Sequence, residues 1–253
     1  MEKLLTIGYS TLAERLQNIT PPNLDLPHEI YISIQNPNKV SFNLPNSFGF
    51  QHITSEEKGV AKSRNAVLRN AKSRYLLFAD DEITFLSQGI ESAIEYLETH
   101  PDCDLILAQA IDTNGMLRKA YPNKEVKLNK FNCAKAATYE MIVRVDTAKK
   151  NGVKFDEKFG AGVENYLGDE YIFITDLIKS GGSAVFLPLT IAIHPAESSG
   201  SRWGTEPDLR ARARVFQRVF GAVAPIIRAG FYLKNYQKFG GAKNLTKFVI
   251  GNF

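Results

Sequence analysis

Short apolar runs alternate with amphipathic segments along most of this chain. Runs rich in Val, Ile, Leu and Phe predict buried strands over 4–9, 29–35, 75–79, 104–110, 141–145, 184–187 and 189–193. Apolar positions spaced three and four apart predict helices over 12–19, 59–72, 87–100 and 169–179. This alternation of strands and helices predicts an α/β fold with a mostly parallel central sheet flanked by helices.

Several element ends carry local signals. Ser10 and Thr11 are placed to cap the first helix, and Glu14 stands at capping-box spacing from Thr11. Asn114-Gly115 predicts a hairpin turn within the less regular stretch 111–138, and Pro188 predicts a break between the last two strands.

Ligands of open α/β sheets bind where the strands end at their carboxyl side. The informative side chains are therefore those that follow the predicted strands: Ser10, Thr11, Asn36, Asp80, Asp81, Glu82 and His194.

Three consecutive carboxylates, Asp80, Asp81 and Glu82, follow the strand over 75–79. Such a cluster is costly unless a cation lies among the charges. Mg²⁺ and Mn²⁺ favour oxygen ligands, and Mg²⁺ binds through one or two carboxylates together with substrate phosphates. The alternative is a solvated acidic turn.

The helix that precedes these acids begins with two cations, Lys62 and Arg64. Cations are unfavourable near a helix N-terminus unless an anion binds there. A diphosphate would suit the site, held by backbone N–H groups and by Arg64. The alternative for Arg64 is an ordinary ion pair.

These residues, Gly59–Asn65 followed by Tyr75–Glu82, resemble the motifs of family 2 glycosyltransferases of the GT-A fold. In that family, a Gly-x-x-x-Ala/Ser-Arg-Asn helix precedes a strand that ends in Asp-x-Asp. Further matching motifs follow in the same order: Phe155–Gly160, Gly168–Phe173, Gly181-Gly182, Pro188 and His194. The resemblance covers about residues 4–200. It therefore implies a GT-A (Rossmann-like) domain.

Three positions depart from the family pattern. Glu82 takes the last place of the Asp-x-Asp motif, and the usual Gly-Glu-Asp reads Gly168-Asp169-Glu170 with its two acids exchanged. The first strand ends in Gly8–Thr11 in place of the commoner Pro-Thr-Tyr-Asn.

The resemblance implies a nucleotide-sugar donor, here expected to be a UDP-sugar, and transfer of the sugar to an acceptor hydroxyl with inversion. It implies a divalent Mn²⁺ or Mg²⁺ ion on Glu82 and Asp80, with His194 near the ion or the diphosphate. Glu170 is the expected general base, and Asp169 is the alternative because the acids are exchanged. The expected donor-binding residues are Ser10, Thr11, Asn36, Lys62, Arg64, Asp80 and Asp81. Turn formation accounts equally well for Asn36.

Two other functions remain open at this level. A nucleotidyltransferase also uses a doubly wound sheet, a metal and a nucleotide, but Gly8–Thr11 lacks the glycine-rich basic loop it would favour. A non-catalytic member that binds sugar nucleotides is the other alternative, since both acidic motifs are altered.

Charge changes the picture at the C-terminal end. The 253 residues carry a net charge of +4, which is too mild for a dedicated nucleic-acid binder. Residues 202–253 hold ten Lys/Arg and two Asp/Glu, a net of +8, and interleave the cations with aromatic rings. We expect a glycosyltransferase domain over 1–201 and a basic, helical C-terminal segment over 202–253.

This basic segment suits an anionic membrane surface, which would favour a glycan or lipid-linked glycan acceptor and a role in surface polysaccharide synthesis. The alternative is a tail packed on the body or on a second subunit of a homo-oligomer. Trp203 follows the body and either stacks on a sugar or plugs the tail. With two cysteines, Cys103 and Cys133, and neither a signal peptide nor an 18-residue apolar run, we expect a cytoplasmic or peripheral protein.

Overall fold

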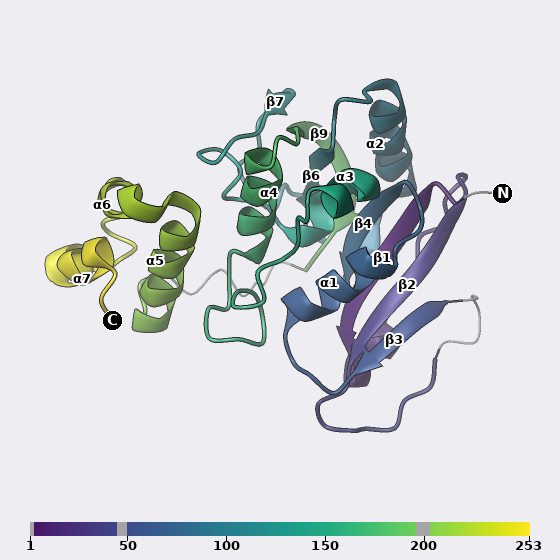
Figure 1. Cartoon of the computed structure of the whole chain (residues 1–253), viewed down its shortest axis with the longest axis horizontal. Helices are drawn as coiled ribbons and strands as arrows, with labels where there is room; N and C mark the ends of the chain where they lie inside the picture. The colour runs from purple at the N-terminus through teal and green to yellow at the C-terminus, as the bar shows by residue number, and fades with distance from the viewer. Residues whose placement is uncertain (1–2, 45–49, 196–202) are drawn as a thin grey trace.

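The computed structural model describes residues 3–44, 50–195 and 203–253. A twisted sheet forms the middle layer, with helices on both faces, and a helical unit extends from one side (Figure 1). The strands lie in the order β3-β2-β1-β4-β8-β6-β9-β5, and β7 pairs with β9. Parallel pairing joins β1 to β2 and β4, β2 to β3, and β6 to β9; the remaining pairs are antiparallel.

The described strands are β1 (Leu5–Leu12), β2 (His28–Gln35), β3 (Gln51–Ser55), β4 (Tyr75–Asp80), β5 (Thr84–Phe85), β6 (Leu105–Ile111), β7 (Val126–Lys127), β8 (Met141–Arg144) and β9 (Ala184–Ile193). The α-helices are α1 (Val60–Asn70), α2 (Ser87–Thr99), α3 (Val145–Lys150), α4 (Asp169–Lys179), α5 (Glu206–Phe220), α6 (Ala224–Lys234) and α7 (Leu245–Ile250). Short 3₁₀ helices are η1 (Ala13–Asn18), η2 (Thr138–Glu140), η4 (Gly221–Val223) and η5 (Gly241–Asn244). The predicted mostly parallel, helix-flanked α/β sheet is confirmed.

Alternation along β4 divides the core into two layers. Leu76 and Phe78 pack with α1, α3 and α4, whereas Tyr75, Leu77 and Ala79 pack with α2 and η1. Successive side chains of a strand point to opposite faces, so a strand covered on both sides reads as a continuous apolar run. This is why the sequence signal at 75–79 is a plain apolar block.

The first helix differs from its prediction. β1 continues through Ser10 and Thr11, and only the 3₁₀ helix η1 follows. Leu12 is its N-cap and makes no side-chain capping bond, so the predicted capping box of Thr11 and Glu14 is wrong. Thr11 instead faces the sheet edge, because parallel pairing with β2 keeps the chain extended to Leu12.

The end of the sheet also differs in detail. Pro188 does not divide the strand, since β9 continues across it. The register of β9 against β6 shifts in this region, between Leu107 and Ala110 of β6. A proline donates no ladder hydrogen bond and is tolerated at such an irregularity. The predicted turn at Asn114-Gly115 is present, closed by one antiparallel bridge between Ile111 and Leu117. β3, an exposed edge strand, gave no apolar signal and was not predicted.

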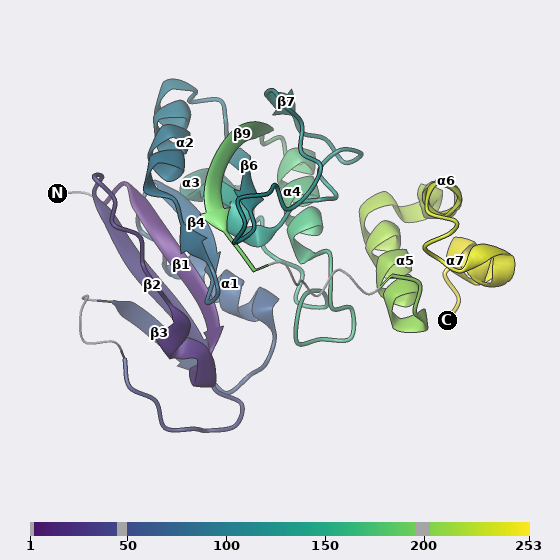
Figure 2. The ribbon, with the colours of Figure 1, turned by 180° about the vertical axis from the view of Figure 1, so that it is seen from behind.

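Helix α5 packs beside α4, and α6 and α7 lie beyond it, away from the sheet (Figures 1 and 2). Thr205 caps α5 by accepting a hydrogen bond from the Asp208 backbone N–H, and Gly168 allows a close approach because a Cβ there would lie 2.6 Å from Val215. Four of the rings expected at a membrane surface pack against one another inside this unit instead, Phe216, Phe231, Tyr232 and Phe239, whereas Tyr236 is 41% exposed.

Trp203 belongs to the same packing. Its ring lies 5.4 Å from that of Phe239, with the Arg212 guanidinium 4.0 Å from its centroid, as expected for a plug. The predicted boundary at 201/202 falls in 196–202, outside the described residues. One hydrophobic cluster joins tail residues such as Leu209 to body residues such as Phe173. Among the described residues, no helix is long and apolar enough to cross a membrane.

Candidate functional site

The acidic turn after β4 divides its side chains between the two faces of the sheet. Asp80 continues the alternation of Leu76 and Phe78 toward α1 and α4, and Asp81 turns toward η1. Ser10 is the register partner of Asp80 in β1, and Thr11 donates a 2.6 Å hydrogen bond to Asp81. The sheet therefore brings the first two motifs together at one edge.

Arg64 links the two acidic motifs. Its Nη2 lies 2.9 Å from Oδ1 of Asp80, and its Nη1 lies 2.5 Å from Oδ2 of Asp169. Arg64 is 6% exposed, and its guanidinium lies over the Phe155 ring. Gly160, at φ +100°, leaves room for Asp169, because a Cβ there would lie 2.9 Å from its carboxyl carbon. A buried arginine held by two carboxylates fixes both of them in place.

Glu170 follows Asp169 in the first turn of α4 and is partly buried. Burial raises the pKa of Glu170 well above its ordinary value, and the charge of Asp169 and a hydrogen bond with it raise it further, while Arg64 opposes them. Perturbed carboxyl groups of this kind are typical of catalytic acids and bases. Asp169 is the more buried acid and is bound to Arg64, whereas Glu170 forms no ion pair with any described residue.

Arg15 of η1 neutralises the other two acids of the turn. Its guanidinium lies 2.7 Å from Asp81 and also pairs with Glu82. Burial raises the pKa of Asp81, whereas the Thr11 hydroxyl and Arg15 lower it. The Glu82 side chain is 50% exposed.

His194 lies across from this turn. β5 pairs antiparallel with β9, with Thr84 opposite Ile193, and His194 is the residue that follows Ile193. Arg118 Nη1 lies 2.9 Å from His194 Nδ1 and 3.1 Å from its carbonyl oxygen. The Tyr139 ring stacks on His194 at 4.9 Å.

Tyr139 ties His194 to the acids. Burial raises the pKa of Tyr139, and the charges of Asp80 and Glu170 are among its further causes. Neighbouring Glu140 is fully buried on Lys119 and Tyr121, which anchors the loop after β6 to the base of the site. His194, Tyr139 and Arg118 therefore form one wall of the site.

Two predicted donor-binding residues have other partners. The Asn36 amide makes both of its hydrogen bonds to the backbone of Val40, as a turn requires. Lys62 pairs with Glu57 at 2.5 Å. At the start of α1, the Val60 N–H donates to Ala161, and Gly59 donates to Gln35, so these two groups are already satisfied by the protein. Ser10 differs from Asn36 and Lys62, because its buried hydroxyl has no hydrogen-bond partner in the described structure.

The predicted divalent ion would find few ready ligands. No three His, Cys, Asp or Glu side chains among the described residues are grouped so that they could hold a metal. Asp80 uses only Oδ1 on Arg64, and Glu82 is half exposed. Two carboxylates are enough for Mg²⁺ when substrate phosphates complete its coordination. Asp80 and Glu82 would therefore hold an ion only together with a diphosphate, and Glu82 would have to exchange its ion pair with Arg15.

Sequence reasoning missed Arg15, Arg118 and Tyr139. Arg118 follows β6, whose end lies at the same sheet edge, so the rule that pointed to Asn36 and His194 also covered this loop. Sequence reasoning did not single out Arg118 because the loop has only a weak hydrophobic periodicity. Arg15 and Tyr139 carried no sequence signal, because only the folded chain brings them to the acids.

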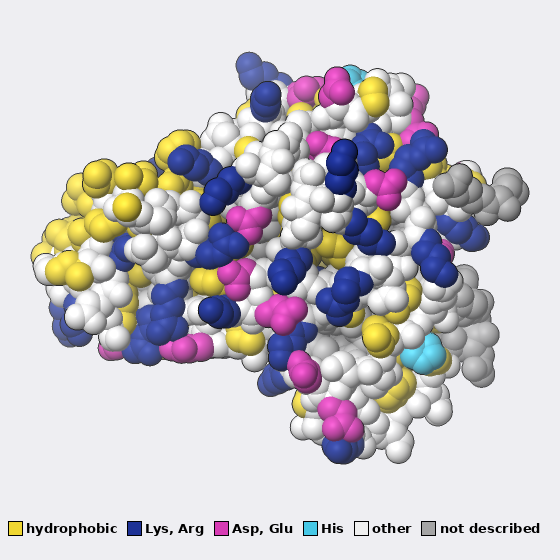
Figure 3. Space-filling model, viewed as in Figure 1, with side chains coloured by type: hydrophobic (Ala, Val, Ile, Leu, Met, Phe, Trp, Pro, Cys, Tyr) yellow, Lys and Arg dark blue, Asp and Glu magenta, His cyan; other side chains and the backbone are white. Residues whose placement is uncertain are grey.

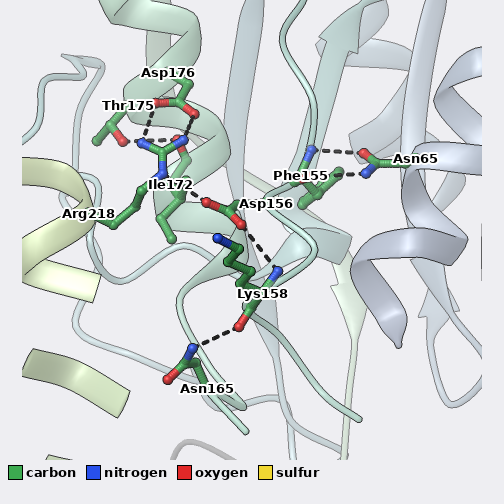
Figure 4. A network of polar contacts seen from close by, with 9 residues as sticks. All are labelled: Asn65, Phe155, Asp156, Lys158, Asn165, Ile172, Thr175, Asp176 and Arg218. Atoms are coloured by element: carbon green, nitrogen blue, oxygen red, sulfur yellow. Dashed lines mark hydrogen bonds and ion pairs between the residues drawn. The ribbon is translucent and has the colours of Figure 1, made fainter. Parts of the chain in front are cut away.

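The segment between the motifs is held by α1 and α5 (Figure 4). The Asn65 amide makes two hydrogen bonds to the Phe155 backbone, and Arg218 of α5 bridges Asp156 and Asp176. Helix α5 thus supports the loop that precedes α4 and the site acids.

A model of the family described as glycosyl transferase family 2 matches residues 38–159. No curated protein matches the sequence significantly. Among solved structures, S. aureus TarS is 15% identical with a TM-score of 0.61, covering 95% of this chain and 44% of that one. The chain thus spans less than half the length of that protein.

A shorter form, S. aureus TarS 1-349, gives a TM-score of 0.60 at 14% identity for its complex with UDP-GlcNAc, covering 98% of this chain and 79% of that one. Its UDP complex gives 0.58 at 15%, covering 97% and 74%. At such identities the likeness concerns the fold. Together with the family match over residues 38–159, it confirms the resemblance found in the motifs: these residues match glycosyl transferase family 2, and the chain has the GT-A fold.

Proposed function

We propose that this domain binds a nucleoside-diphosphate sugar and transfers the sugar, with inversion, to an acceptor hydroxyl. The observation that carries the proposal is the bridge of Arg64 to Asp80 and Asp169, with Glu170 beside it at the same edge of the sheet. Arg64 thus joins Asp80, an acid expected to contact the nucleotide, to Asp169, the residue next to the candidate base Glu170.

Glu170 would act as the general base. The acceptor oxygen attacks the anomeric carbon, its proton passes to the Glu170 carboxylate, and the bond from that carbon to the β-phosphate oxygen breaks with its electrons. The nucleoside diphosphate leaves with the added negative charge. The raised pKa of Glu170 brings it nearer the working pH, where a base both is ionised and accepts a proton readily.

Arg118 would hold the leaving diphosphate. It is partly buried beside His194, and no carboxylate of the described residues forms an ion pair with it. A guanidinium with free N–H groups binds phosphate oxygens in a fixed geometry. A divalent ion on Asp80 and Glu82, when bound, would supply further neutralisation of the same charge.

A UDP-sugar donor is supported by the solved structures of a similar fold, whose titles carry UDP and UDP-GlcNAc. The unpartnered Ser10 hydroxyl, next to Asp80, suits the nucleoside half of such a donor. For the acceptor we propose a glycan or lipid-linked glycan of a surface polysaccharide.

Donor binding tests the proposal directly. A thermal-shift series with UDP, UDP-GlcNAc and other nucleotide sugars, each with Mn²⁺, should raise the Tm for at least one, because a ligand at 100 times its Kd stabilises by about 2.7 kcal/mol. The nucleosides without phosphate serve as the control. No shift with any nucleotide sugar would contradict the proposal.

Glu170→Gln should retain donor affinity and lose on the order of 10²-fold or more in transfer rate, because it removes the base. Glu164→Gln, a surface carboxylate paired with α5 arginines, is the matched control and should transfer normally. If Asp169→Asn loses transfer at intact folding while Glu170→Gln does not, the base is Asp169.

The same substitution has a stability signature. The raised pKa means that folded Glu170 holds its proton where the unfolded chain, near pKa 4.3, has lost it. Its contribution to stability is complete below that value and is lost as the pH rises through the raised pKa. Glu170→Gln should therefore raise the Tm more at pH 8 than at pH 5, while the wild-type transfer rate should rise with pH over that range.

Glu82→Gln should weaken Mn²⁺-dependent UDP binding about tenfold, the equivalent of 1.4 kcal/mol, and leave binding without metal unchanged. Glu95→Gln, an exposed carboxylate of α2, is the control. Equal Mn²⁺ dependence in wild type and Glu82→Gln calorimetric titrations would remove Glu82 from the ion.

Arg118→Gln should weaken UDP binding by tenfold or more and leave uridine binding unchanged, because only the diphosphate contacts the guanidinium. Arg69→Gln, in the last turn of α1, is the control. An unchanged UDP affinity would leave Arg118 as a structural partner of His194.

A further inference from the structure

The outer side of α6 and α7 exposes aliphatic side chains. Ile226 is 73% exposed, Leu233 63% and Ile250 65%, and Val223 lies beside them in sequence. These four residues are called the α6–α7 face. In Figure 3, hydrophobic side chains gather at the end of the molecule that α6 and α7 form. Clustered exposure of this kind marks an interaction surface.

A shallow groove of about 310 Å³ continues this face between the two helices. Its lining is apolar apart from one hydroxyl, with Ala229, Leu233, Leu245, Thr246, Val249 and Ile250. The aromatic rings of the same helices are packed inside, so the exposed surface is aliphatic.

The basic charge of the tail is divided between two places. The arginines of α5 pair with acids: Arg210 and Arg214 with Glu164, Arg212 with Asp208, and Arg218 with Asp156 and Asp176. Arg228 is buried. The α5 cations are thus already paired with acids of the body and of the tail itself.

The lysines are different. The sequence contains no Asp or Glu after Asp208, and Lys234, Lys243 and Lys247 are exposed without an ion pair to any described residue. They belong to the segment that carries the α6–α7 face. Lys234 follows Leu233 directly, and Lys247 stands one helical turn before Ile250. Free ammonium groups so close in sequence to exposed aliphatic side chains give this segment two kinds of complementarity, to anions and to apolar chains.

A bilayer with anionic headgroups is complementary to both parts of this surface, the lysines and the aliphatic side chains. Aliphatic side chains enter the acyl boundary, and lysines near the surface attract the headgroups. A second copy fits poorly, because a symmetric contact would bring two acid-free basic surfaces together. We propose that the α6–α7 face docks this protein on an anionic lipid bilayer, lying in the interface while α5 connects it to the catalytic body.

Flotation with vesicles tests this on the whole chain. The wild-type protein should bind vesicles of phosphatidylcholine with 30% phosphatidylglycerol, and it should bind vesicles of phosphatidylcholine alone much less. The triple variant Ile226→Ser, Leu233→Ser, Ile250→Ser should lose at least tenfold in partitioning, because each side chain gives up apolar burial. Met116→Ser, at a site 67% exposed elsewhere, is the matched control and should bind as wild type.

A second triple variant isolates the charge. Lys234→Gln, Lys243→Gln, Lys247→Gln should lose at least tenfold on anionic vesicles, and Lys124→Gln, Lys127→Gln, Lys135→Gln, three exposed lysines elsewhere, should not. Circular dichroism and an unchanged Tm confirm folding. The inference is wrong if the wild-type protein does not bind anionic vesicles, or if the serine variant binds them as well as wild type. It is also wrong if sedimentation shows that the α6–α7 face mediates self-association. Its outcome is independent of donor binding.

Discussion

The ion pairs of Arg64 hold the site together. One buried guanidinium on α1 joins Asp80, at the end of β4, to Asp169, at the start of α4. These residues are far apart in sequence, and each reaches the site from a different element. Removing one partner of such a buried set typically costs 3–5 kcal/mol, because an uncompensated charge remains. The position of Glu170, one residue after Asp169, depends on this bridge.

The alternation of side chains along the strands explains why the acidic turn serves two purposes. Asp80 faces α1 and α4, where Arg64 holds it beside Asp169 and near Glu170. Asp81 faces η1, where Thr11 and Arg15 bind it. Two neighbouring acids, Asp80 and Asp81, therefore face different elements at the sheet edge. This separation relieves their mutual repulsion, with two arginines as the compensating charges.

The C-terminal helices divide their charge by a similar principle. Arginines of α5 bind acids of the loop and of α4 and so support the approach of Gly168 and Asp169 to the site. The segment beyond α5 has no acids and keeps its lysines free. The basic C-terminal stretch therefore has two parts in the folded chain: the α5 arginines, which contact the body, and the lysines beyond α5, which are exposed.

The sequence alone determined the α/β class, most strand and helix positions and the family motifs, because buried parallel strands and amphipathic helices have strong local patterns. It also identified the acids that meet at the sheet edge. Only the tertiary structure decided their partners: Arg64 binds two carboxylates, Asn36 closes a turn, and Arg15, Arg118 and Tyr139 reach the site from segments without a local signal. Composition could not tell whether the tail's rings face lipid or each other, because a hydrophobic ring satisfies either environment and only packing of α5 to α7 selects one.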